Sequence, residues 1–137
     1  MASKGQVEYI NPETMHRNPA FTNVVVVTGS VKTVYVGGQN SVDPAGTIVG
    51  KGDLHAQTVQ TLKNIEAALA AAGAGPEHIV RWTLYVVQGQ SLQEGFRAFQ
   101  SVWGQPANPP AISMAFVAGL AHPDYLVEMD AVAVVPQ

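Results

Sequence analysis

The chain has 137 residues, of which 47% are apolar and 12% charged, a length that suits a single domain over 1–137 with one hydrophobic core. A net charge of -3, with 7 scattered Lys and Arg residues, argues against a nucleic-acid partner, and the absence of cysteine excludes disulfides and thiolate chemistry. The apolar runs are too short to span a bilayer and the N-terminus lacks a signal-peptide core, so we expect a soluble cytoplasmic protein with no membrane partner.

The N-terminal segment carries strand and turn signals. Val7–Ile10 predicts a first short strand, and the prolines and polar residues of Asn11–Ala20 predict an irregular loop. The valine-rich Asn23–Thr28 and the following Lys32–Val36 predict two strands. Gly29-Ser30 lies between them, so the sequence predicts a hairpin.

A pair of glycines, Gly37-Gly38, ends the second strand of this predicted hairpin. Glycines at such a place indicate that backbone or a ligand approaches too closely for a Cβ, although a simple bulge or strand end is an equal alternative. Asp43–Gly46 then has the composition of a turn, after which Thr47–Val49 could pair back briefly.

A long amphipathic helix is predicted over Leu54–Ala72, with Asp53 as its N-cap and Gly73 ending it. Apolar residues recur at helical spacing, which assigns this face to the core. They are Val59, Leu62, Ile65 and Leu69.

The next strand, His78–Val87, has two unlike faces, because side chains alternate along a strand. The apolar face suits packing under a helix and comprises Val80, Trp82, Leu84 and Val86. The other face is wetter and carries Arg81, Thr83 and Tyr85.

The C-terminal part predicts a second helix and two strands. Ser91 and Glu94 have capping-box spacing, Gly104 ends the helix, and its inward face is expected to hold Leu92, Phe96, Phe99 and Trp103. The strands are Ala111–Val117 and Tyr125–Val135. Glu128 lies within the second of these strands. A carboxylate in such an apolar run is expected to lie at a sheet edge, to accept hydrogen bonds, or to belong to a functional site.

This order of elements predicts an α+β fold with two helices on one face of a mixed sheet. The other sheet face would then need a second layer, and the low charged fraction favours copies of the same chain as that layer. We therefore expect a homo-oligomer with clefts between its subunits.

Four separated patterns, over a span from about Tyr9 to Val134, resemble the RidA/YjgF superfamily. They are Val36–Gln39, Leu62–Ile65, Ile79–Val87 and Leu126–Ala133. The resemblance implies a chorismate-mutase-like fold, a homotrimer, no cofactor, and small-molecule clefts between subunits. Well-understood members hydrolyse reactive imines or enamines to a keto acid and ammonia, whereas others carry older endoribonuclease L-PSP labels that this charge composition does not favour.

One departure from the family pattern concerns substrate anchoring. In the active deaminases an arginine follows a Pro-Ala pair and grips the substrate carboxylate with its planar fork. Here Pro110-Ala111 is followed by Ile112. This chain differs from the family pattern at other positions too. The Phe21-Thr22 region stands where the family has a tyrosine, and Gly37 stands where it has a small hydroxyl residue. Met114 takes the place of a cysteine, and Phe96 that of an asparagine.

The resemblance keeps Glu128 as the candidate catalytic group, which would orient or activate a water molecule. A purely structural role at a subunit interface is the alternative. The candidate ligand-binding residues are Tyr85, Gly37, Gly38, Gln39, Ile112, Met114 and Thr22. Tyr85 could equally be an interface aromatic, and Arg81 or His122 could compensate for the missing arginine. The four histidines fit no metal spacing, so no metal site is predicted.

Two functions from different classes fit these residues. The first is hydrolysis of a small imine, enamine or related metabolite in an apolar inter-subunit cleft. The second is a non-catalytic small-molecule-binding or interaction protein that has lost the deaminase chemistry, since several family positions differ together.

Overall fold

The computed structural model of the chain describes residues 3–137. The strands and helices follow one another in the order that the sequence predicts, and the α+β class is confirmed. In chain order they are β1 (Gln6–Ile10), β2 (Val24–Thr28), β3 (Val31–Gln39), α1 (Leu54–Ala71), the 3-10 turn η1 (Pro76–His78), β4 (Ile79–Val87), α2 (Leu92–Trp103), β5 (Ala111–Val117) and β6 (Val127–Pro136).

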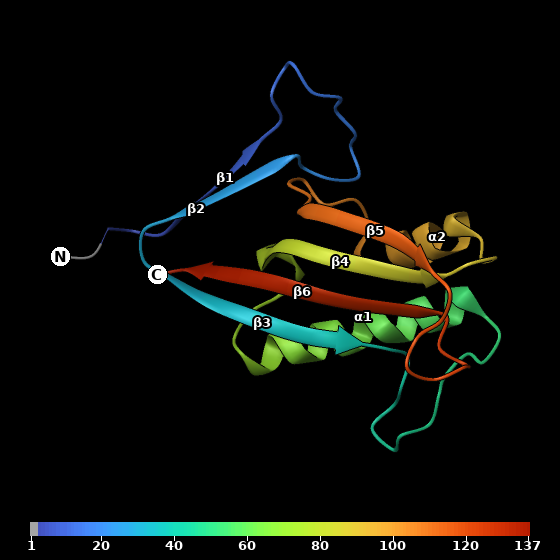
Figure 1. Ribbon diagram of the computed structural model, residues 1–137. Helices are drawn as coiled ribbons and strands as arrows, with labels where there is room; N and C mark the ends of the chain where they lie inside the picture. The colour runs from blue at the N-terminus through green and yellow to red at the C-terminus, as the bar shows by residue number, and fades with distance from the viewer. Residues whose placement is uncertain (1–2) are drawn as a thin grey trace.

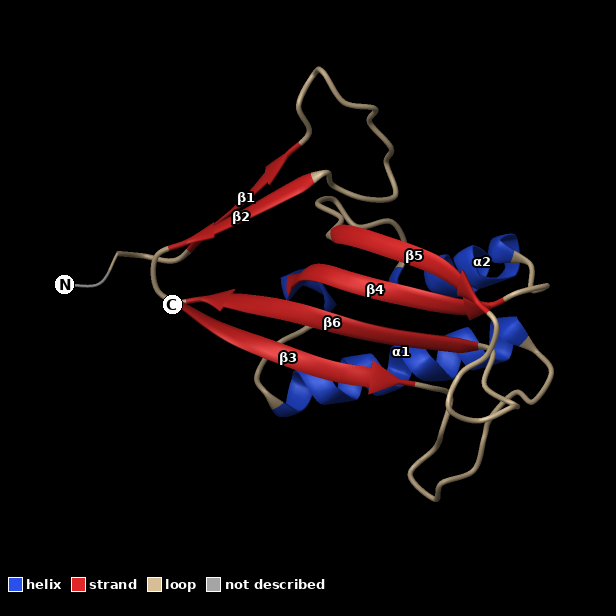
Figure 2. Cartoon of the chain, in the orientation of Figure 1, coloured by secondary structure: helices blue, strands red, loops and turns tan. Residues whose placement is uncertain are grey.

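The main sheet has the strand order β3-β6-β4-β5. The β4 and β5 strands run parallel, whereas β6 is antiparallel to both of its neighbours. Both helices cover the same face of this sheet, as Figure 1 and Figure 2 show. The mixed sheet with helices on one face is therefore as predicted.

The predicted hairpin is wrong, because β2 pairs with β1 in a separate two-stranded sheet and β3 pairs with β6. Ser30 does not close a hairpin, because its backbone forms hydrogen bonds with residues near both ends of the chain. Its amide donates to the Ser3 carbonyl (2.8 Å), and its carbonyl accepts from the Gln137 amide (2.9 Å). Gly29 has a positive φ of 78°, and a Cβ there would collide with the Lys4 carbonyl. The chain therefore turns a corner, and β1 and β2 form an N-terminal arm beside the sheet (Figure 1).

The core lies between α1 and the sheet. Asp53 caps α1 as predicted, since its Oδ1 accepts from the Ala56 amide at 3.1 Å. From the predicted stripe, Leu62, Ile65 and Leu69 are fully buried, whereas Val59 is only half-buried. The sheet side of this core comes largely from the alternate residues Val127, Met129, Ala131 and Ala133 of β6.

The first turn of α2 differs from the prediction in two ways. Ser91 is the N-cap residue, but its side chain makes no capping hydrogen bond, and Glu94 instead pairs with Arg97 at 2.9 Å. Leu92 and Phe96 are not buried, because they border a cavity rather than closely packed core and remain 48% and 45% exposed. The last turns do pack inward, with Phe99 and Trp103 against the Trp82 indole at ring-centroid distances of 5.3 and 5.6 Å.

Within the part of the chain that the structure describes, no helix covers the sheet face opposite α1 and α2, which we call the bare face (Figure 2). Tyr35 on β3 is 80% exposed on this face, and Arg81 on β4 is also exposed. Within residues 3–137, neither helix has the length and apolar character needed to cross a membrane.

Candidate functional site

An apolar cavity of about 280 Å³ lies between α2 and the helix-covered face of the sheet, and we call it the β5 cavity. Its lining residues come from both helices, from three strands, and from the loop between β1 and β2, which we call the arm loop. They include Phe21, Leu54, Trp82, Phe96, Ile112 and Met114. Thr58 is the one hydroxyl among them, and it already donates to the Leu54 carbonyl at 2.8 Å. The described lining therefore suits an apolar group and has no cation to hold a carboxylate.

The family positions on β5 face into this cavity. In the parallel register Ile112 lies opposite Trp82 and Met114 lies opposite Leu84, and all four side chains line the cavity. Thr22 behaves differently: it is buried, its hydroxyl donates to the Pro109 carbonyl, and its amide donates to the Pro110 carbonyl at 3.0 Å. Thr22 thus ties the arm loop to the start of β5, while its neighbour Phe21 contributes to the cavity wall.

Glu128 faces the other way. Val127 and Met129 on either side of it line the β5 cavity, so the intervening carboxylate points to the bare face of the sheet. There it lies across from Tyr85, its register partner on β4. The Glu128 residue is half-buried, and its Oε1 lies 3.4 Å from the Asn40 side-chain nitrogen, which donates to it.

The two glycines that end β3 have different surroundings. A Cβ built on Gly38 would lie 2.8 Å from Glu128 Oε2, whereas a Cβ on Gly37 would meet no atom of residues 3–137 within 4 Å. Of the two alternatives raised by the sequence, close approach holds for Gly38, and the approaching group is the Glu128 carboxylate. Gln39 lies at the bulge beside them, and its amide donates to the Gly37 carbonyl at 3.3 Å.

Asn40 is the residue that the sequence interpretation missed. Its side-chain amide donates to the Val127 carbonyl at 3.0 Å as well as to Glu128. The loop carrying Asn40 is held in turn by Asn64 of α1, which donates to the carbonyls of Asn40 and Val42, both at 2.9 Å. We define the Glu128 patch as Gly38, Asn40, Tyr85 and Glu128.

The two candidate substitutes for the missing arginine lie outside the β5 cavity. Arg81 is on the bare face, where its Nη2 donates to Ser113 Oγ at 2.9 Å. His122 lies in the loop before β6, where its Nδ1 accepts from the Asp124 amide at 3.0 Å and its ring lies 5.2 Å from that of Tyr125. No group of three or more potential metal-ligating side chains comes together among residues 3–137.

Two sets of candidate site residues therefore lie on opposite faces of one sheet. Ile112 and Met114 lie on the helix-covered face, and the Glu128 patch lies on the bare face. A ligand in the β5 cavity of one chain is separated from Glu128 of that same chain by the sheet itself.

Comparison with known proteins places this arrangement in a family. The family described as Endoribonuclease L-PSP matches residues 15–135. The chain belongs to the RidA/YjgF superfamily. Among curated members, the RutC family protein slr0709 of Synechocystis is 37% identical over 107 residues, which span 75% of this chain and 78% of the relative.

Solved structures of the superfamily share the fold. The Rid family protein YyfB from Yersinia pestis has a TM-score of 0.83 at 34% identity, covering 94% of this chain and 98% of YyfB. The YjgF gene product of E. coli has a TM-score of 0.66 at 29% identity, covering 74% and 80% of the two chains. The predicted superfamily and fold are thus confirmed.

Proposed function

We propose that this superfamily member hydrolyses a small, largely apolar imine or enamine in clefts that neighbouring copies of a homotrimer share. The observation that carries the proposal is the separation of the two sets of site residues. If the β5 cavity and Glu128 act on one substrate, they must come from two different copies, with the bare sheet face of one chain near the β5 edge of the next.

The β5 cavity sets the expected substrate class. Ile112 and Met114 occupy the positions at which the resemblance expects an arginine and a cysteine, and the described lining has no charged side chain. A buried carboxylate without a partner is costly, so we expect the part of the substrate that enters the cavity to be uncharged. A short aliphatic or aromatic group fits a volume of about 280 Å³.

The proposed chemistry needs only water and one carboxylate. Glu128 takes a proton from a water molecule as the water oxygen bonds to the C=N carbon, and it returns that proton to the nitrogen to give a neutral carbinolamine. Glu128 then takes the proton of the carbinolamine hydroxyl and passes it to the nitrogen as the C–N bond breaks, which releases ammonia and leaves an aldehyde or ketone. The imine and one water molecule therefore account for all atoms of the two products.

A matched pair of imines tests this function. An amine oxidase converts isoamylamine to an uncharged imine, and an amino-acid oxidase converts leucine to the imine with the same side chain plus a carboxylate. We expect the wild-type chain to accelerate ammonia release from the first imine more than from the second. Ile112→Arg should reverse that preference, because its guanidinium would pair with the carboxylate.

Acceleration of neither imine by the wild-type chain would contradict the proposed activity. The non-catalytic alternative remains the second candidate, favoured by the replacement of the arginine by Ile112. In that case an apolar ligand bound in the β5 cavity would raise the melting temperature of the protein, and no ammonia would be released.

A further inference from the structure

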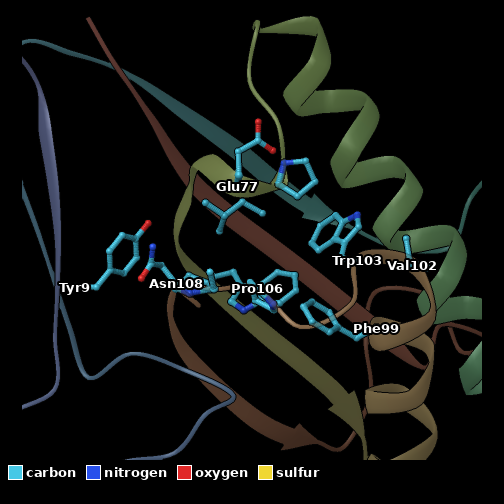
Figure 3. A pocket seen from close by; sticks show the side chains of 12 residues that line it. Tyr9, Glu77, Phe99, Val102, Trp103, Pro106 and Asn108 are labelled. Atoms are coloured by element: carbon cyan, nitrogen blue, oxygen red, sulfur yellow. The ribbon is translucent and has the colours of Figure 1, made fainter.

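A second cavity adjoins the β5 cavity, with Trp82 and Phe99 in the walls of both, and we call it the Trp103 cavity. It has a volume of about 470 Å³ and is bordered by η1, the end of α2, the segment before β5 and Tyr9 of the arm. Figure 3 shows Tyr9 and Asn108 on one side of it, Trp103 and Phe99 on the other, and Glu77 at the η1 end. Its size lies within the usual range of small-molecule sites.

Aromatic rings dominate one wall of the Trp103 cavity. Phe99 and Trp103 meet edge to face at 5.7 Å, and the Trp103 indole stacks on that of Trp82 at 5.6 Å. The Trp103 Nε1 donates to Glu66 Oε2 at 3.2 Å, which fixes the orientation of the indole. A fixed aromatic wall of this kind favours ring stacking and cation–π contact.

The charge of the lining is negative. Glu77 is the one charged side chain among the described lining residues, and that side chain is 71% exposed. Its Oε1 is 3.7 Å from His78 Nδ1, but this nitrogen already accepts the Gly75 amide hydrogen at 3.0 Å. Because Nδ1 accepts this hydrogen bond, it does not donate one to Glu77.

Two neutral polar groups complete the lining opposite the aromatic wall. The Tyr9 hydroxyl and the Asn108 amide can each donate and accept a hydrogen bond. Burial raises the pKa of Tyr9, so its hydroxyl keeps its proton at neutral pH. Arg17 lines a neighbouring hollow that also includes Tyr9 and Asn108, and it is not part of the Trp103 cavity lining.

We propose that the Trp103 cavity is a second small-molecule site, which binds a ring-bearing organic cation such as a protonated aralkylamine. The ring stacks on the Trp103 and Phe99 wall while the ammonium group lies near the Glu77 carboxylate. Trp82 and Phe99 line both cavities, but Glu77, Trp103 and Asn108 line the Trp103 cavity and not the β5 cavity. Removal of the Glu77 charge therefore tests this site without changing the β5 cavity.

The tryptophan content provides a direct readout. The chain has 2 tryptophans, and both line the Trp103 cavity. In a Trp82→Phe chain the Trp103 indole is the sole tryptophan fluorophore, so its emission reports this cavity. The probes are phenethylammonium and 2-phenylethanol, which share a ring and chain length and differ in charge.

We expect phenethylammonium to change the Trp103 emission of the Trp82→Phe chain in a saturable way. Calorimetry on the wild-type chain should give a lower Kd for phenethylammonium than for 2-phenylethanol. Glu77→Gln should weaken phenethylammonium binding about twofold to fivefold, the range of an exposed ion pair, and leave 2-phenylethanol binding unchanged. Glu94→Gln removes the same charge at the other end of α2 and should change neither affinity.

Three results would overturn the proposal: no saturable binding of phenethylammonium, equal sensitivity of both probes to Glu77→Gln, or equal loss with Glu94→Gln. The Glu77 side chain is highly exposed, so Glu77→Gln should not disturb the packing of the core or the fold. Ammonia release by Glu77→Gln should equal that of the wild-type chain, which separates failure of this site from failure of the proposed function.

Discussion

Glu128→Gln is expected to lower imine hydrolysis by about 10²- to 10⁴-fold, the usual contribution of a positioned general acid or base. Glutamine keeps the shape of the side chain and an oxygen that can accept from Asn40, but it cannot take a proton from water. The measurement is ammonia release from the uncharged isoamylamine-derived imine at saturating concentration.

The control for Glu128→Gln is its assembly and its ligand affinity. Sedimentation should give the same oligomer as for the wild-type chain, and an apolar ligand of the β5 cavity should still raise the melting temperature. Unchanged ammonia release by a correctly assembled Glu128→Gln protein would assign Glu128 a structural role only.

Gly38→Ala is expected to reduce turnover by about tenfold to a hundredfold, since misplacement of a catalytic group by about 1 Å can cost that much. The added methyl group would lie where it displaces the flexible end of Glu128, so the fold should tolerate it. Gly37→Ala is the matched control, because a Cβ there has no neighbour within 4 Å among the described residues of the chain. The comparison requires kcat and the melting temperature of both variants.

An equal effect of the two glycine substitutions would show that the Gly38 approach to Glu128 is unimportant. If Gly37→Ala alone lost activity, the neighbouring copy rather than Glu128 would be the group that requires a bare glycine. A large loss of melting temperature in Gly38→Ala would likewise remove its functional interpretation.

Much of the fold follows from local sequence pattern. The strand over Ala111–Val117 has the same bounds in the structure as predicted, and α1 begins after the predicted Asp53 cap. These elements were predictable because their signals, a β-rich apolar run and a capped helical period, are local.

The hairpin prediction failed because long-range contacts decide the direction of the chain at Gly29-Ser30. This dipeptide is compatible with a tight turn, but Ser30 is bonded to Ser3 and Gln137 at opposite ends of the chain. Turn composition alone carries no information about such partners.

The site was predictable in its residues and not in its arrangement. Alternation puts Ile112 and Met114 on one face of their strand, but the relation of that face to Glu128 depends on registers across β4 and β6. Asn40 escaped notice because a loop amide has no motif, and its role emerges only from its contacts with Glu128 and Val127.

Subunit complementation tests most directly the claim that two copies share each site. Glu128→Gln removes the proposed acid-base group, and Phe96→Glu puts a charge at the β5 cavity on a partly exposed side chain. Each variant alone should be nearly inactive. After unfolding and joint refolding of equal amounts, about a quarter of the sites should combine two intact halves and release ammonia at the wild-type rate. Mixed oligomers that remain as inactive as their parents would contradict the shared site.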